Sequence, residues 1–137
     1  MNILIAPDKF KGSLEAREVC RAIEESLHGF NTGLQLQSIP MADGGEGTSD
    51  MLTEFSKGKK IKVVVRDPLF RNIESTYGIS GDGKTAFVEM AAASGLQLLR
   101  LTERNVMLGT TFGTGQLIAS ALDQGVKNIV LRVGGSG

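Results

Sequence analysis

The sequence predicts an α/β fold with a partly parallel sheet, flanking helices and an antiparallel strand meander in the middle of the chain. Two observations support this prediction. At both ends, short apolar runs alternate with segments whose apolar residues recur at helical spacing, the pattern of parallel strands joined by helices. In the middle, strand-like runs follow one another through short turns, the pattern of neighbouring antiparallel strands.

The first strand and helix are predicted near the N-terminus. Residues 2–6 form an almost continuous apolar run that ends at a proline, as a buried parallel strand does. Apolar residues then predict an amphipathic helix over 14–28, with Ser13 as its N-cap. Cys20 lies on the apolar face and is interpreted as a core residue. His28, near the end of the helix, is interpreted as a surface residue that favours the helix dipole.

The second strand and helix complete an α/β segment over residues 1–58. A strand is predicted over 34–39, where a proline closes it. Glycines and acidic residues fill the following loop, and a helix is predicted over 48–55. Its inward-facing side chains are expected to be Met51, Leu52 and Phe55.

The middle segment, residues 59–95, is predicted to be the antiparallel meander. Its strands are expected over 60–65, 74–79 and 85–90. Turn-forming residues separate these runs, so the connections are short. A short helix is expected to begin at the alanines 91–93 and to stop at Gly95.

The last segment, residues 96–137, returns to the α/β pattern. A helix is expected to open at Thr114 or Gly115 and to run through Gln124. A buried strand follows over 128–133, and glycine-rich residues come directly after it. The inward side chains of the helix are expected to be Leu117, Ile118, Ala121 and Leu122.

The composition excludes several classes of protein. The 137 residues include 15 basic and 15 acidic side chains, and the resulting zero charge argues against nucleic-acid binding and polybasic membrane-surface binding. No apolar run approaches the ~18–20 residues of a membrane span, and no targeting segment is visible. One cysteine and one histidine leave no material for an internal disulfide, a thiolate metal cluster or the usual Ser-His and Cys-His nucleophiles. This cysteine usage fits a reducing cytoplasm.

Charged loops after the first two predicted strands form the candidate site. Asp8, Lys9 and Lys11 follow the first strand, and Asp43 and Glu46 follow the second. In an open α/β sheet, the carboxyl ends of the strands form the ligand crevice. Lysines there bind phosphate or carboxylate, while carboxylates hold Mg²⁺ through water or accept a proton from a hydroxyl. The alternative interpretation is that these side chains are ordinary solvated loop charges.

Two further stretches leave a structural and a functional interpretation open. Glu89, at the end of an apolar strand, is either paired with a neighbouring group or functional. The hydroxyl-rich residues 110–115 either present Thr111 and backbone N–H groups to an anion or cap their own helix. Standard nucleotide signatures do not decide between them, because neither a Walker A sequence nor a complete G-x-G-x-x-G pattern is present.

Five stretches of the chain resemble the bacterial glycerate kinase family. They are residues 5–14 (IAPDKFKGSL), 40–48 (PMADGGEGT), 89–96 (EMAAASGL), 110–115 (TTFGTG) and 134–136 (GGS). The resemblance covers essentially the whole chain, and its first two stretches are highly specific. It implies a cytoplasmic, two-domain α/β enzyme that uses ATP and Mg²⁺ to phosphorylate D-glycerate, giving 2-phosphoglycerate.

The resemblance also implies the site residues. The charged loops at Asp8, Lys9, Lys11, Asp43 and Glu46 look like part of the family's active cleft. We expect Asp43, Lys11 and Asp8 to be catalytic, with Asp43 acting on Mg²⁺ or the substrate hydroxyl. Lys11 is expected to contact phosphate or the glycerate carboxylate. Substrate- or phosphate-binding roles are expected for Lys9, Ser13, Gly44, Gly45, Glu46, Ser94, Thr111, Gly134, Gly135 and Ser136.

Family members run much longer than these 137 residues, so we expect an N-terminal portion of a longer two-domain enzyme. Residues beyond Gly137 are expected to supply nucleotide contacts, and this chain alone is expected to bind ligands weakly and turn over little. An incomplete sheet favours a homo-oligomer or pairing with a complementary C-terminal half. The alternative functions are a non-catalytic anion-binding fragment and one half of a split enzyme.

Overall fold

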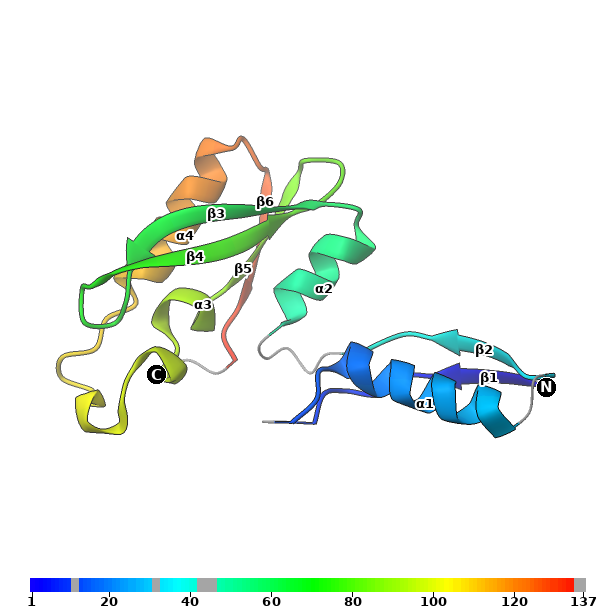
Figure 1. The fold of residues 1–137 in the computed structure, drawn as a ribbon. Helices are drawn as coiled ribbons and strands as arrows, with labels where there is room; N and C mark the ends of the chain where they lie inside the picture. The colour runs from blue at the N-terminus through cyan, green and yellow to red at the C-terminus, as the bar shows by residue number, and fades with distance from the viewer. Residues whose placement is uncertain (11–12, 31–32, 42–46, 135–137) are drawn as a thin grey trace. The chain divides into compact units, whose positions relative to one another are not determined.

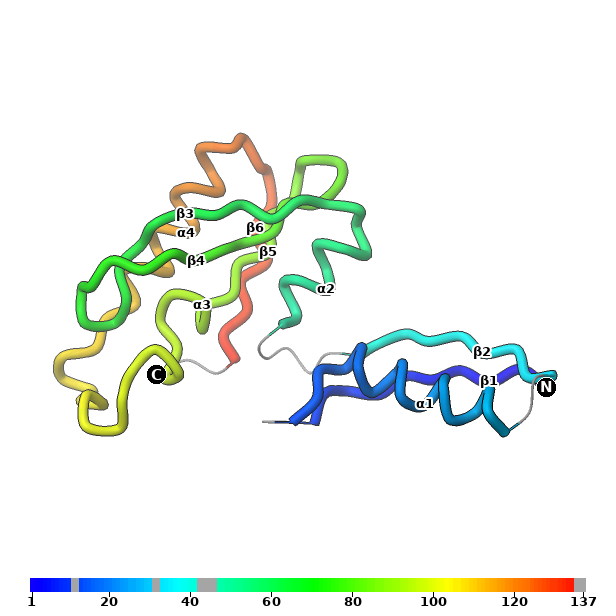
Figure 2. The backbone as a smooth tube through the Cα atoms, viewed as in Figure 1, coloured from blue at the N-terminus to red at the C-terminus, as the bar shows by residue number. Residues whose placement is uncertain are grey.

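The computed structural model describes the chain except for residues 11–12, 31–32, 42–46 and 135–137 (Figure 1). The chain divides into two compact units, Met1–Asp43 and Gly44–Gly137, whose backbone is traced in Figure 2. Each unit combines strands with helices, which confirms the predicted α/β class. No described helix is long and apolar enough to cross a membrane. The segment boundaries at residues 58 and 95 stay a prediction.

The first unit is built on two parallel strands. β1 (Asn2–Ile5) and β2 (Gln35–Ser38) lie within the two predicted strands and pair with each other along their whole lengths. α1 (Ala16–Phe30) connects them, because parallel neighbours need a crossover rather than a tight turn. Among the described residues of this unit, the buried apolar ones are Ile5, Ala16, Val19 and Cys20. Cys20 therefore belongs to the core, as predicted.

The start of α1 differs from the prediction. The helix begins at Ala16, and Ser13 is not its N-cap. Ser13 lies in a turn in which its N–H group donates to the Phe10 carbonyl at 2.9 Å. Phe10 also forms an isolated antiparallel bridge with Leu14, and this bridge occupies backbone groups that would otherwise extend the helix. Ser13 is consequently an exposed turn residue.

The apolar face of α1 is only partly covered within the first unit. Val19 and Cys20 are buried, whereas Ile23 is 36% exposed and Phe30 is 90% exposed. Two strands form too narrow a surface to cover a helix of 15 residues. His28 is exposed in the last turn of α1, where a basic side chain suits the helix dipole.

The second unit contains a four-stranded sheet with the order β3-β4-β5-β6. β3 (Lys59–Arg66), β4 (Asn72–Ile79) and β5 (Thr85–Glu89) pair antiparallel in sequence order, which confirms the predicted meander. β6 (Asn128–Arg132) pairs with β5 in parallel, so one sheet holds the meander and the last predicted strand. β4 pairs with β3 at eight positions but with β5 at two. Most of the β3–β4 hairpin therefore extends as a two-stranded ribbon.

Helices cover both faces of this sheet. α2 (Thr48–Phe55) packs on one face, where Thr53 lies against Gly78. α4 (Phe112–Asp123) packs on the other face, where a serine hydroxyl of the helix is 3.1 Å from the Tyr77 hydroxyl. Successive residues of a strand face opposite sides, so the neighbours Tyr77 and Gly78 mark the two faces.

Short helices follow β5. They are α3 (Ala91–Ser94), η1 (Leu96–Leu98) and η2 (Leu101–Glu103). The predicted helix at the alanines 91–93 is thus confirmed, and it ends before Gly95. The carbonyl of Ala92 accepts the Ser75 hydroxyl at 2.8 Å, and this bond attaches α3 to the same face of the sheet as α4.

The core of the second unit is a single cluster of buried side chains from the sheet, α3, α4 and the turn after α4. Its members are Val65, Tyr77, Ile79, Ala86, Val88, Ala93, Leu117, Ala121 and Val126. Leu117 and Ala121 are fully buried, as the helical spacing predicts. Leu122, expected on the same face, is instead 56% exposed.

α2 has the predicted bounds but buries different side chains. Phe55 is 61% exposed, and the buried residues are Thr48, Ser49 and Thr53. A Cβ atom at Gly78 would lie 1.6 Å from the Thr53 hydroxyl oxygen. This close approach of helix and strand leaves room for small side chains and none for an aromatic ring.

α4 begins earlier than predicted, at Phe112 rather than at Thr114 or Gly115. Gly113, in the first turn, lies against the end of β3, because an added Cβ atom would be 1.8 Å from the Arg66 carbonyl oxygen. The glycine that weakens the helix signal in the sequence is therefore the residue that allows this contact.

β6 is not the buried strand that its composition predicts. It lies at the edge of the sheet, and each of its residues is exposed or half-buried. Val130 is 36% exposed and Leu131 is 42% exposed. Local hydrophobicity identified the strand, but it does not reveal which neighbours cover it.

Candidate functional site

A pocket in the second unit brings together two of the predicted site residues. Its volume is about 390 Å³, and it lies among the β3–β4 turn, the end of α3 and residues 96–111. Ser94 and Thr111, both expected to bind substrate or phosphate, line it. The other described lining residues are Pro68, Leu96, Leu99, Arg104, Asn105, Val106, Gly109 and Thr110.

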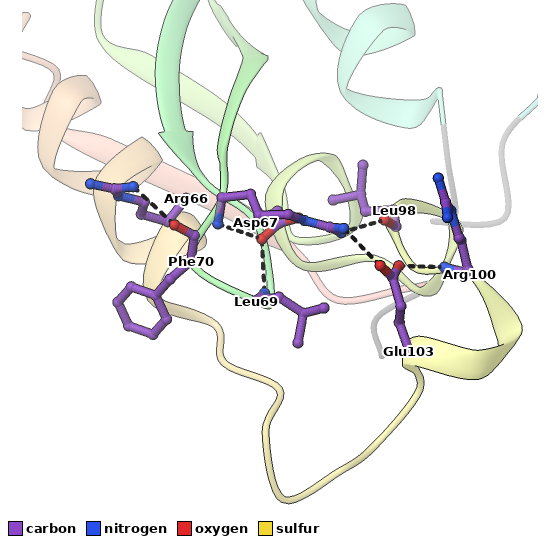
Figure 3. A network of polar contacts seen from close by, with 8 residues as sticks. Arg66, Asp67, Leu69, Phe70, Leu98, Arg100 and Glu103 are labelled. Atoms are coloured by element: carbon purple, nitrogen blue, oxygen red, sulfur yellow. Dashed lines mark hydrogen bonds and ion pairs between the residues drawn. The ribbon is translucent and has the colours of Figure 1, made fainter.

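Asp67 shapes the turn that forms one wall of the pocket. Asp67 is 1% exposed, and its Oδ1 atom accepts the N–H groups of Leu69 at 2.8 Å and Arg71 at 2.9 Å (Figure 3). Its Oδ2 atom accepts the Nε–H of Arg71. Burial raises the pKa of Asp67, but the hydrogen bonds from Arg71 and Leu69 outweigh burial and leave that pKa lowered. Asp67 is therefore an ionised carboxylate with both oxygens bonded.

Arg71 joins this turn to the segment that forms the opposite wall. Its Nη1 atom donates to Glu103 Oε1 at 2.9 Å, and its Nη2 atom donates to the Leu98 carbonyl at 3.2 Å. Glu103 Oε2 accepts the backbone N–H of Arg100 at 2.9 Å, as Figure 3 also shows. This backbone bond and the Arg71 guanidinium outweigh desolvation and lower the pKa of Glu103. The pocket walls are thus held together by ionised groups far apart in sequence.

The start of α4 is attached to the same turn. The Thr110 N–H group donates to the Pro68 carbonyl at 3.1 Å. The rings of Phe70 and Phe112 stack with their centroids 5.4 Å apart. Phe70 adopts a positive φ of 62°, which turns the chain between β3 and β4 at this contact.

Two threonines at the start of α4, Thr110 and Thr111, have different contacts. Thr110 Oγ1 accepts the Phe112 N–H at 3.2 Å, which supports the capping interpretation for that residue. Thr111 is exposed, lines the pocket and makes no side-chain cap. Below them, the hydroxyls of Ser94 and Thr114 are 2.7 Å apart and buried. The stretch therefore caps the helix with one hydroxyl and presents another to the pocket.

Glu89 lies at the carboxyl end of β5 and is 6% exposed. Its Oε2 atom accepts the Ser49 N–H, at 3.4 Å, in the first turn of α2. The N-cap residue of α2 is Gly47, which has no side chain to take this place. The geometry supports the paired interpretation of Glu89, since a carboxylate is favoured at a helix N-terminus.

In the first unit, the described part of the charged loop begins beside β2. The pairing of β1 and β2 continues past the strands, because the Met41 N–H donates to the Pro7 carbonyl at 2.8 Å. Asp8 follows directly and is exposed, and its Oδ1 atom accepts the Lys9 N–H at 2.7 Å. Lys9 is half-buried.

Several predicted site residues lie outside the described part of the chain. They are Lys11, Asp43, Gly44, Gly45, Glu46, Gly135 and Ser136. Gly134 is described, and it follows β6 as a half-buried residue. In the described ranges no group of three or more His, Cys, Asp or Glu side chains could hold a metal ion. The roles of all these residues stay predictions.

The sequence reasoning missed the polar residues that complete the pocket. Arg104 and Asn105 line it from the loop after η2, and Thr110 lines it before α4. Arg104 is exposed, and its Nη2 atom donates to the Leu96 carbonyl at 3.3 Å. Only their position shortly before residues 110–115 could have indicated them, because nothing in the local sequence distinguishes Arg104 from Arg100.

Comparison with known proteins gives one consistent result. A family model described as "Glycerate kinase family" matches residues 3–137. The chain is 49% identical over 136 residues to "Glycerate kinase" of Haemophilus influenzae, covering 99% of this chain and 36% of that protein. It is 46% identical over 136 residues to "Glycerate 2-kinase" of Escherichia coli, with the same coverage.

A solved structure agrees with these matches. A crystal structure provisionally assigned as glycerate kinase 2 from Salmonella typhimurium LT2 matches with a TM-score of 0.83 and 44% identity. The match covers 99% of this chain and 36% of the solved one. The chain thus spans about 36% of the length of the curated relatives that it matches.

Proposed function

The chain belongs to the glycerate kinase family, and we propose from this membership that it contributes to ATP-dependent phosphorylation of D-glycerate. The observation that carries the proposal is the 46–49% identity to curated glycerate kinases over 99% of the chain. One of these relatives is named a glycerate 2-kinase, which supports 2-phosphoglycerate as the product. The single cysteine supports a cytoplasmic location.

In the proposed reaction, a glycerate hydroxyl oxygen forms a bond to the γ-phosphorus of ATP as the bond to the β–γ bridging oxygen breaks. ADP leaves with that electron pair, and the hydroxyl proton passes to a carboxylate, for which we propose Asp43. Positioning and charge neutralisation dominate such a transfer. Lys9 and Lys11 are proposed to neutralise phosphate or glycerate carboxylate charge, with backbone N–H groups at Gly44 and Gly45 as further phosphate donors.

In the alternative role that we propose for Asp43, its carboxylate holds Mg²⁺ instead of accepting the proton, with Asp8 as a second carboxylate donor. The exposed Asp8 carboxylate, one residue beyond the contact between Pro7 and Met41, supplies the hard oxygen ligand that Mg²⁺ prefers. Two carboxylates and substrate phosphates make a typical donor set for this ion. When bound, the cation neutralises charge on the transferring phosphoryl group.

We propose that Ser94 and Thr111 contact substrate in the pocket of the second unit, and that Gly134, Gly135 and Ser136 contact phosphate. The shared lining of one pocket supports the first pair. A homo-oligomer or a complementary C-terminal half is proposed to complete the enzyme, given that the chain spans about 36% of its relatives.

The proposal is tested by measuring ADP release with Mg-ATP and D-glycerate, with L-glycerate as the control. The chain is assayed alone and together with the remaining segment of the Haemophilus influenzae relative, expressed separately. We expect D-glycerate-dependent turnover in the mixture and little from the chain alone. Turnover in neither sample would refute the proposal, and ligand binding without turnover would instead support a non-catalytic anion-binding module.

The role of Asp43 is tested by Asp43→Asn in the sample that turns over. We expect turnover to fall at least ~100-fold, the scale of one general-base or metal contribution. Asp82→Asn, in an exposed turn between β4 and β5, is the matched control and is expected to leave turnover unchanged. Unchanged turnover in Asp43→Asn would remove this residue from the mechanism.

A further inference from the structure

We propose that the pocket of the second unit binds a small oxyanion, a carboxylate or a phosphate group, through the guanidinium of Arg104. Among the described residues that line this pocket, Arg104 alone carries a charged side chain. The proposal rests on the proposed function only for the identity of the physiological anion, which would be the carboxylate of glycerate or a phosphate group of its reaction partner.

The charge of Arg104 is not used by a neighbouring acid. No described carboxylate lies within ion-pair distance of its guanidinium, although Glu103 is the adjacent residue. Glu103 is occupied by Arg71 on one oxygen and by the Arg100 N–H on the other. Asp67, the other acid at the pocket wall, has both oxygens bonded as well. Arg71 and backbone N–H groups therefore occupy both local acids, and Arg104 makes no ion pair with either of them.

The guanidinium of Arg104 is also oriented. Its Nη2 atom donates to the Leu96 carbonyl, which leaves the donors on Nε and Nη1 for a ligand. A guanidinium presents these donors in a fixed fork that matches the two oxygens of a carboxylate or phosphate. An anchored arginine of this kind loses less conformational freedom when it binds an anion.

The remaining lining suits a small hydroxylated anion. Asn105 Oδ1 accepts the Met107 N–H at 3.0 Å, so the side-chain NH₂ group of Asn105 is the part that can donate to a ligand. The exposed hydroxyl of Thr111 offers a donor and an acceptor for an alcohol. Apolar side chains such as Leu99 complete the wall. A volume of about 390 Å³ is at the small end of the range for ligand pockets.

The test is a titration of the isotopically labelled chain with D-glycerate, inorganic phosphate and glycerol, followed by amide NMR shifts. We expect D-glycerate, phosphate or both to shift the Gly109, Thr110 and Thr111 signals, and neutral glycerol to leave them in place. A response to D-glycerate alone assigns the site to the carboxylate, and a response to phosphate alone assigns it to a phosphate group. Arg104→Gln is expected to weaken this binding roughly 10-fold or more, the scale of hydrogen bonds to a charged group.

Two control variants separate charge from geometry. Arg100→Gln removes the same charge four residues away, outside the pocket, and is expected to leave the dissociation constant unchanged. Arg104→Lys keeps the charge without the fork and is expected to recover only part of the affinity. Wild-type affinity in Arg104→Gln, shifts that lie outside the pocket, or no response to either anion would overturn the proposal.

The outcome is distinguishable from that of the kinase assay. Anion binding that depends on Arg104, in a sample without D-glycerate-dependent turnover, supports this site and refutes the proposed function. Turnover that survives Arg104→Gln with an unchanged KM for D-glycerate and for ATP refutes this site and leaves the proposed function standing.

Discussion

The two units of the chain differ in how much apolar surface each encloses. In Met1–Asp43, four of the described residues are buried apolar side chains between one helix and two strands. In Gly44–Gly137, a buried cluster of nine described residues joins a four-stranded sheet to the helices packed on it. The first unit also leaves much of the apolar face of α1 exposed. Because burial of apolar surface is the main source of stability, we expect the second unit to be much the more stable.

This difference determines how rigidly each part of the proposed site is held. The pocket of the second unit is held by the buried carboxylate of Asp67 and by contacts of Arg71 that join segments distant in sequence. The charged loop of the first unit follows a two-stranded sheet with few buried neighbours. Loops on such a unit are typical of elements that open locally. Three substitutions and one labelling experiment test how far the two units differ in stability.

Leu117→Ala tests the core of the second unit. Leu117 is fully buried in the core cluster, so we expect the second unit to lose about 3–5 kcal/mol of unfolding free energy. Urea unfolding followed by circular dichroism measures the loss. Leu122→Ala, the same change at a 56% exposed position of the same helix, is expected to cost less than about 1 kcal/mol. Equal losses for both variants would contradict the observed core.

Asp67→Asn weakens the network that holds the pocket walls. We expect a loss of about 2–3 kcal/mol at neutral pH, because an ionised acceptor of several hydrogen bonds becomes neutral. The folded-state pKa of Asp67 is lowered, so its stabilisation is present above the unfolded-state pKa near 3.9. It is lost as the pH falls through the lowered folded-state value.

The measurement is the unfolding free energy of wild type and Asp67→Asn between pH 7 and pH 2. The two curves are expected to converge at the acid end, where the wild-type carboxyl is protonated as well. Asp123→Asn, at the exposed end of α4, is the control for the loss of one charge. A pH-independent gap would mean that Asp67 acts through its shape rather than its charge.

Gly113→Ala tests the close contact between α4 and β3. The added Cβ atom would meet the Arg66 carbonyl at 1.8 Å, so the helix must shift, at a cost of about 1–3 kcal/mol. Gly115→Ala, two residues along the same helix, meets no atom within 4 Å and is expected to stabilise by up to about 1 kcal/mol. Thermal unfolding of the two variants gives opposite signs if the packing is as described.

Cys20 reports the opening of the first unit without any substitution. It is the single cysteine of the sequence, is 5% exposed and lies in the small core of this unit. We expect a thiol reagent to label it at urea concentrations at which the second unit is still folded. Leu117→Ala is expected to leave this labelling rate unchanged below its own transition. Labelling that begins only with unfolding of the second unit would show that the chain is one cooperative body.

Much of this architecture could be predicted from the sequence because its signals are local. Helical and alternating periodicity located α2 and the three meander strands to within about two residues. Local patterns failed where coverage by other elements decides the outcome. Phe55 and Leu122 are apolar at helical spacing, yet both are exposed. Ser13 has the chemistry of an N-cap, but the bridge between Phe10 and Leu14 keeps this segment out of the helix, so that Ser13 lies in a turn.

The pocket was only half predictable for a similar reason. Ser94 and Thr111 belong to recognisable stretches, and the structure brings them together. Arg104 carries no local signature, because its place in the pocket and its lack of an ion pair with Asp67 or Glu103 depend on contacts that Arg71 makes with these acids. The bond between Arg71 and Glu103 spans 32 residues, and no pattern along the chain encodes that contact.

The two-stranded ribbon formed by β3 and β4 has a mechanical consequence. Its base is fixed in the four-stranded sheet, where β5 joins it at two positions, and its far end carries the turn with Pro68. A ribbon of two strands is more strongly twisted than a wider sheet. Packing holds the far part of the ribbon in place of pairing with β5, because Ser75 donates to the Ala92 carbonyl and Gly113 lies against Arg66. The bonds from Arg71 and Thr110 brace the far end against the neighbouring segment and set the stiffness of the pocket.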